Sequence, residues 1–236
     1  MKRFLSILFA SAAIGLAAAP AEATLTTIGT ANYSLDAGLD YNLIYDEDLG
    51  LIWLDYSNAL NTWQNQRDWA AGLNAGGVLT YNINPGLNVT WGADWRLPTV
   101  VPQNYNVGYD GTTGFGYNIT TGSEMGHLFY TELGNKGYYA TDGTGPQSGW
   151  GLVNTSPFTN LQPNFYWSGT EYAPNPNLAW GFYFNYGNQD ADVKNDNLYA
   201  LAVRPGDVAA VPEPGTMLLL GSGMAGLVAF RKRFGF

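Results

Sequence analysis

The chain contains no cysteine and a single histidine, and each shortage argues against a class of chemistry. Without cysteine there is no thiol nucleophile and no disulfide framework. Any histidine-based triad or zinc site would have to rest on His127, for which a structural role is the simpler interpretation. The glycine-rich phosphate-binding motif followed by Lys and Ser or Thr does not occur. We therefore expect no enzymatic activity and no organic cofactor.

Charged residues are also scarce, at 12% of the chain, and most of them are acidic. Residues 24–210 carry five basic and seventeen acidic side chains, a net charge of −12. Such a surface repels nucleic acid and anionic lipid, so neither is an expected partner. Aromatic residues make up 15% of the chain and glycine is abundant, which favours one loop-rich folded domain over disorder.

Two uncharged apolar runs lie at the ends of the chain. Lys2 and Arg3 precede apolar residues 4–19 and a small-x-small cleavage site at residues 21–23. This pattern predicts a signal peptide over residues 1–23.

The second run, residues 215–230, predicts a transmembrane helix of about 24 Å, slightly shorter than a typical hydrocarbon core. The basic cluster that follows it indicates a cytoplasmic end, with the preceding domain outside the membrane.

The whole segment 211–236 resembles the PEP-CTERM sorting signal of Gram-negative bacteria that make extracellular polysaccharide. The matching residues are Val211, Pro212, Glu213, Pro214, Arg231, Lys232 and Arg233. The resemblance implies transient membrane anchoring, processing by an exosortase-type peptidase, and release to the cell surface or the extracellular matrix. An ordinary membrane helix that stays uncleaved is the alternative.

Between the ends, the pattern predicts strands and two helices. Segments 41–45 and 49–54 flank an acidic turn and indicate a hairpin. Asn61 is expected to cap a first helix that ends at Gly76, and Ser123 a second helix that ends at Gly134. Residues 100–122 have no helical period and are expected to form a long surface insertion. Strands are expected at 165–168, 179–186 and 198–204, with residues 187–197 as the loop of a final hairpin.

Three blocks occur in order along this domain: Gly-Leu-Ile-Trp at 50–53, Ala-Asp-Trp-Arg-Leu-Pro-Thr at 93–99, and Tyr-Trp-Ser-Gly-Thr at 166–170 with later elements to Pro205. In this arrangement residues 41–205 resemble the Lcl C-terminal domain family. The resemblance implies an α+β, C-type-lectin-like single domain, with two helices on twisted antiparallel strands, and surface binding of sulfated or other polysaccharides.

The chain departs from the family pattern in two ways. The family's second helix usually starts directly after the Leu-Pro-Thr block, whereas here it follows the long insertion. Family members also carry cysteines that this chain lacks. The ligand chemistry of the altered loop is therefore expected to carry over less well than the architecture.

Most conspicuous family-block residues are interpreted as structural, with the arginines paired to a carboxylate such as Asp94. These residues are Trp53, Trp95, Arg96, Leu97, Pro98, Thr99, Trp167, Trp180 and Arg204. Candidate carbohydrate contacts in the loops are Tyr105, Tyr109, Asn118, Asn188 and Gln189. Asp190, Asp192 and Asp196 are candidate calcium ligands, with a solvated polar turn as the alternative.

The sequence thus predicts an exported protein of the cell surface or biofilm matrix that binds carbohydrate or another matrix component without catalysis. One alternative is a structural matrix protein with no ligand. Another is a glycoside hydrolase that uses two carboxylates, since seventeen acidic residues leave many candidate pairs.

Overall fold

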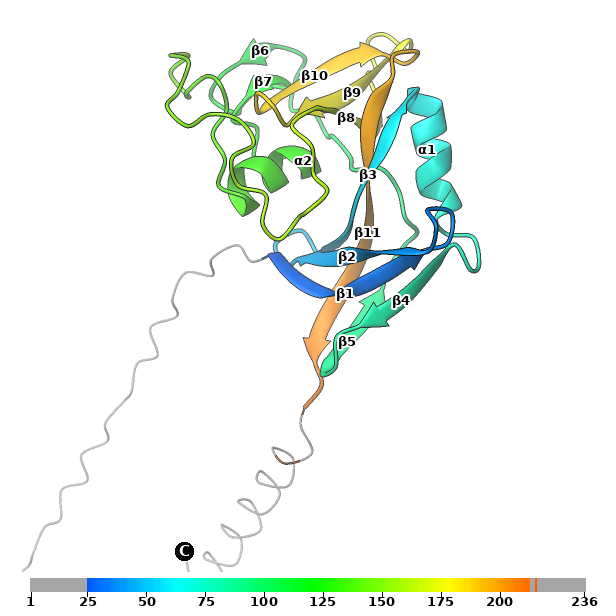
Figure 1. Ribbon diagram of the computed structural model, residues 1–236. Helices are drawn as coiled ribbons and strands as arrows, with labels where there is room; N and C mark the ends of the chain where they lie inside the picture. The colour runs from blue at the N-terminus through cyan, green and yellow to red at the C-terminus, as the bar shows by residue number, and fades with distance from the viewer. Residues whose placement is uncertain (1–24, 213–214, 216–236) are drawn as a thin grey trace, which may run out of the picture.

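The computed structural model describes residues 25–212 and residue 215 (Figure 1). The predicted signal peptide (1–23) and the predicted transmembrane helix (215–230) lie outside these residues, apart from Gly215. Within the described part, no helix has the length and apolar character needed to cross a bilayer.

The described residues form an α+β domain with eleven strands, as the sequence predicts in outline. The strands are β1 (Leu25–Tyr33), β2 (Leu39–Asp46), β3 (Leu51–Asn61), β4 (Leu79–Ile83), β5 (Leu87–Trp91), β6 (Val107–Gly108), β7 (Phe115–Tyr117), β8 (Phe165–Glu171), β9 (Leu178–Tyr183), β10 (Asn188–Val193) and β11 (Leu198–Ala210). The helices are α1 (Trp63–Gly72) and α2 (Glu124–His127), and a π-helical turn, Leu128–Glu132, continues α2.

The strand β11 joins two groups of strands into one sheet of order β4-β1-β2-β3-β11-β8-β9-β10-β7-β6. Its residues 198–205 pair antiparallel with β3, and residues 206–210 pair with β5. On its other side it pairs in parallel with β8. Figure 1 shows β3 and β11 running between a lower group of strands, β1, β2, β4 and β5, and an upper group that includes β8, β9 and β10. The sheet is mostly antiparallel, with parallel pairs at β8–β11 and β6–β7.

The first helix forms where the sequence predicts, but its cap lies one residue later. Thr62 is the N-cap residue of α1, while the Asn61 side chain accepts a hydrogen bond from the Thr62 amide at 2.9 Å. The helix ends at Gly72, and turns fill the segment to the predicted stop at Gly76. Its buried face carries Trp63, whose indole donates to the Ser168 carbonyl at 2.7 Å. This bond and apolar burial hold α1 against the sheet.

The second helix also begins as predicted, at a Ser123 cap whose hydroxyl accepts from the Gly126 amide at 3.0 Å. After one α-helical turn the hydrogen bonds widen, and the Leu133 amide donates to the Leu128 carbonyl, five residues back. The stripe Met125, Leu128, Phe129 and Leu133 is buried as expected. It packs on aromatic residues of β3, β8 and β9, which form the largest cluster of the core.

The final third corrects the sequence-based prediction. Residues 187–197 are not one loop, because 188–193 form β10, which pairs along its whole length with β9. The hairpin therefore joins β9 to β10 through residues 184–187, where Gly187 adopts φ +73°. The insertion 100–122 has no helix, as predicted, but its two short strands extend the sheet beyond β10.

Candidate functional site

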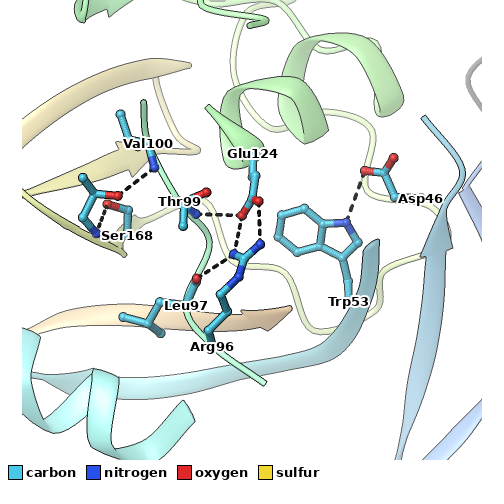
Figure 2. A network of polar contacts seen from close by, with 9 residues as sticks. Asp46, Trp53, Arg96, Leu97, Thr99, Val100, Glu124 and Ser168 are labelled. Atoms are coloured by element: carbon cyan, nitrogen blue, oxygen red, sulfur yellow. Dashed lines mark hydrogen bonds and ion pairs between the residues drawn. The ribbon is translucent and has the colours of Figure 1, made fainter. Parts of the chain in front are cut away.

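The family block around Arg96 is tied to α2 by a two-pronged ion pair (Figure 2). Arg96 Nη1 and Nη2 lie 2.7 and 2.8 Å from the two carboxylate oxygens of Glu124. The Thr99 amide also donates to Glu124, at 2.7 Å, and the Glu124 amide donates back to the Thr99 carbonyl at 3.2 Å. The prediction that Arg96 pairs with Asp94 is wrong, because its partner is Glu124 and Asp94 lies exposed on the surface. Arg96 is thus a structural clamp between the block and the start of α2.

This clamp explains how the chain accommodates its insertion. Val100 forms a β-bridge with Ser123, and the Val101 amide donates to the Gly122 carbonyl. The two ends of the insertion therefore lie side by side, and Glu124 is placed next to Thr99 although the two are far apart in the sequence. The second helix therefore starts beside the Leu-Pro-Thr block in space, although the insertion separates the two in the sequence.

The other family-block residues lie in the protein interior or at its edge. Trp53, Trp95, Trp167 and Trp180 are at most 2% exposed, and Leu97 and Pro98 are buried. A ring without an exposed face cannot stack on a sugar, so these tryptophans form part of the core. Arg204 donates to the Ala93 carbonyl at 2.8 Å and lies over the Trp91 ring, so its expected carboxylate pairing is wrong.

Aromatic side chains gather in a second place, along the loops beside β7 and β10. We name this set the tyrosine face; its members are Tyr109, Tyr117, Tyr138, Tyr139, Trp150 and Tyr186. The centroids of rings in contact lie 4.9 to 6.0 Å apart, and the Trp150 and Tyr186 rings are stacked with an angle of 12° between their planes. Tyr109 and Tyr186 are 40% and 39% exposed. The set is a partly exposed aromatic surface on loops that the fold holds in place.

The structure separates the five predicted carbohydrate contacts. Tyr109 belongs to the tyrosine face, whereas Tyr105 covers the buried Trp180 elsewhere, with its ring stacked at 6.4 Å. Asn118 donates to the carbonyls of Tyr109 and Tyr139, so its amide holds two residues of the face.

The other two predicted contacts lie on β10. Asn188 is half-buried there, at the strand's first residue. Gln189 is 1% exposed and donates to the Gly114 carbonyl at 2.7 Å, which corrects its predicted placement in an exposed loop.

The three candidate calcium ligands do not form a group whose ligand atoms all lie within 4.8 Å of one another, although the Asp192 and Asp196 side chains are hydrogen-bonded. Asp190 and Asp192 lie on β10, and Asp196 lies in the following turn. Burial raises the pKa of the Asp190 and Asp192 carboxyls. Among the described residues, the group of three potential metal ligands within 4.8 Å of one another is a different one.

That group consists of Asp46, His127 and Glu132, at the end of β2 and along the second helix. His127 Nε2 lies 3.1 Å from Glu132 Oε1 and 3.8 Å from Asp48 Oδ2. Asp46 is fully buried and accepts hydrogen bonds from the Trp53 indole and the Leu49 amide, at 3.3 and 3.0 Å (Figure 2). Burial raises the pKa of both the Asp46 and the Glu132 carboxyl, and the charges of neighbouring side chains contribute smaller shifts of these pKa values. The sequence pointed to His127 and to the acidic turn that contains Asp46, but it did not connect these two residues with each other or with Glu132.

A cavity of about 380 Å³ opens beside His127. It is lined by Leu49, Thr99, Val101, Thr120, Thr121, Gly122, Ser123, Glu124 and His127. It lies at the base of the insertion and reaches the edge of the acidic group through the His127 ring.

The sorting motif lies at the boundary of the described residues. Val211 and Pro212 follow β11 as exposed residues, and the Val211 amide donates to the Gly86 carbonyl. Glu213, Pro214, Arg231, Lys232 and Arg233 lie outside the described part. The motif thus begins directly after the last strand of the folded domain.

Two family models match the chain. The model of the Lcl C-terminal domain matches residues 42–204, and that of the PEP-CTERM protein-sorting motif matches residues 210–233. Both agree with the resemblances read from the sequence. No curated protein and no solved structure matches the chain.

Proposed function

The chain belongs to the Lcl C-terminal domain family and ends in a PEP-CTERM sorting motif, and from this premise we propose that it is a non-catalytic binder of extracellular carbohydrate. The sorting motif implies export that depends on an exosortase and transient anchoring through the C-terminal segment. The proposal adds that the released domain has a C-type-lectin-like fold and acts in the polysaccharide matrix or at the cell surface.

The tyrosine face is the observation that supports this proposal most. Aromatic rings with one free face offer apolar area to the C–H faces of a sugar, while their hydroxyl groups remain available for hydrogen bonds. Tyr109, Trp150 and Tyr186 lie in loops that β7, β10 and their hydrogen bonds hold in place. A site that exists before binding costs less conformational entropy when it is occupied.

The negative charge of the domain favours one class of carbohydrate ligand, the uncharged polysaccharides, over the anionic ones. Residues 24–210 carry a net charge of −12, so a sulfated or otherwise anionic polysaccharide would be repelled over the whole approach. An uncharged polysaccharide meets no such barrier. The proposal therefore favours neutral glycans over the sulfated ligands expected from the family resemblance.

Affinity electrophoresis with the purified protein tests this proposal. Gels contain a neutral polysaccharide, an anionic sulfated polysaccharide, or none. We expect retardation in a neutral gel, and we expect Trp150→Ala combined with Tyr186→Ala to reduce the affinity at least tenfold. Tyr105→Ala is the control, because it removes an exposed ring outside the tyrosine face, at 47% exposure against 39% for Tyr186.

Three results would count against the proposal. Migration unaffected by any glycan would favour a structural matrix protein without ligand. Retardation that only Tyr105→Ala abolishes would place the site in the insertion instead. Release of reducing ends from a bound polysaccharide would mean that the protein is a hydrolase.

A further inference from the structure

The buried group Asp46, His127 and Glu132 has the composition of a metal site. Their ligand atoms lie within 4.8 Å of one another, and His127 Nε2 and Glu132 Oε1 are 3.1 Å apart. Two ligands bound about 2.1 Å from one ion, at about 90–110° to each other, lie about 3.0–3.4 Å apart. We propose that these three side chains bind a divalent transition-metal ion of the zinc type. This inference does not depend on carbohydrate binding.

The burial of Glu132 is the first argument. Its side chain has no exposed area, and its Oε2 atom is buried without a hydrogen-bond partner among the described residues. A buried carboxylate oxygen without a partner costs free energy that protein side chains normally offset with a donor. A cation that contacts both oxygens of the Glu132 carboxylate would satisfy this oxygen.

The surrounding charges are the second argument. Asp46, Asp48 and Glu132 gather around one imidazole, and none of them forms an ion pair with a lysine or arginine in the described part of the chain. The imidazole supplies at most one positive charge. The local excess of negative charge favours a bound divalent cation.

The π-helical turn is the third argument. In an α-helix, at about 100° per residue, side chains five positions apart point about 140° away from each other. The widened turn from Leu128 to Glu132 brings His127 and Glu132 onto one side, where their side chains meet. Such turns are rare and occur frequently at functional sites.

The ligand types indicate which ion fits. Calcium and magnesium are bound by oxygen atoms, and an imidazole is a poor ligand for them. Two carboxylates with one histidine suit zinc and similar ions. The Trp53 indole and the Leu49 amide fix the Asp46 carboxylate, as outer hydrogen bonds commonly do for metal ligands. The cavity described above borders the proposed site on the side of the His127 ring.

Titration calorimetry with zinc chloride tests the site on the purified full chain after treatment with a chelator. Excess calcium in the buffer occupies the surface carboxylates, so that weak binding of zinc to them does not contribute to the titration. We expect one zinc ion per chain and a rise in the thermal midpoint when zinc is added. Glu132→Gln and His127→Gln should each weaken zinc binding at least tenfold. Asp192→Asn, an acidic residue on β10, is the control and should leave the affinity unchanged.

Glu132→Gln also gives a readout without metal, because it keeps the shape of the side chain and removes the buried charge. Its metal-free thermal midpoint should equal or exceed that of the parent protein. A lower midpoint would mean that the carboxylate is satisfied in another way, and the proposal would be wrong. Absence of zinc binding, affinity unchanged in both site variants, or equal affinity for calcium without zinc would overturn it as well.

Discussion

The clamp between Arg96 and Glu124 gives the sharpest prediction for stability. Glu124 accepts two hydrogen bonds from Arg96 and one from the Thr99 amide, and its side chain is 17% exposed against 35% for Arg96. In Glu124→Gln the carboxamide NH₂ group replaces one of the two acceptor oxygens. The Arg96 guanidinium can only donate hydrogen bonds, so it loses one of its two acceptors. Hydrogen bonds to charged groups contribute about 1.5–3 kcal/mol, and partial exposure lowers this figure, so we expect a loss of about 2 kcal/mol.

For a domain of this size, 2 kcal/mol corresponds to a fall in the thermal midpoint of about 4–8 °C. Urea unfolding followed by tryptophan fluorescence measures the free energy directly. A double-mutant cycle with Arg96→Met should give a coupling energy of about 1–2 kcal/mol. Asp94→Asn, in the same block but exposed, is the control and should change stability by less than about 0.5 kcal/mol. The reasoning fails if Glu124→Gln is as mild as this control.

Two further predictions concern the upper half of the domain. Gly187→Ala places a Cβ atom 2.7 Å from the Phe129 ring at a φ of +73°, and should cost about 3 kcal/mol in a urea titration. Gly149→Ala, at a φ of +74° with no atom nearby, should cost only the backbone part, about 1 kcal/mol; equal losses would contradict the packing argument. Burial raises the pKa of Tyr166 from 10.0 to about 12, so its contribution to stability is complete below pH 10 and is lost between pH 10 and 12. Between pH 10 and 12 the parent protein should therefore lose up to about 3 kcal/mol more unfolding free energy than Tyr166→Phe does. Parallel curves of unfolding free energy against pH for the two proteins would refute this prediction.

The sequence predicts those elements that local signals determine. An acidic turn between apolar segments identifies the β2–β3 hairpin, and Ser123 identifies the start of α2. The start of α1 is displaced by one residue because Asn61 and Thr62 are both good capping residues. In each case the residues that determine the element are its own neighbours in the chain.

Pairings between distant segments were not predictable in the same way. The β10 strand carries Asn, Gln and Asp on a pattern typical of a loop, and it is a strand because it pairs with β9 on one side and β7 on the other. The partner of Arg96 lies beyond the insertion, and Asp94 was the nearer carboxylate in sequence. Sequence spacing cannot rank such partners without the path of the chain.

The candidate sites were predicted in part for the same reason. Tyr109 was identified from its loop, but Trp150 and Tyr186 join it only through the folding of segments without regular periodicity. Asp46 belongs to an acidic turn whose sequence gives no sign of burial, whereas its side chain is fully buried. A spacing of five between His127 and Glu132 matches no α-helical face, so only the widened turn reveals the pair.

The closed base of the insertion has a consequence for how this domain can diversify. Because Val100 and Ser123 bridge and the Arg96 clamp lies just outside them, the segment between leaves and re-enters the fold at one place, while its strand β7 pairs with β10. Residues can therefore be added to or removed from its exposed turns at a small cost in connection entropy, which grows slowly with length, as long as β7 keeps its place in the sheet. Evolution can thus vary the outer surface of the protein while the remaining architecture stays constant.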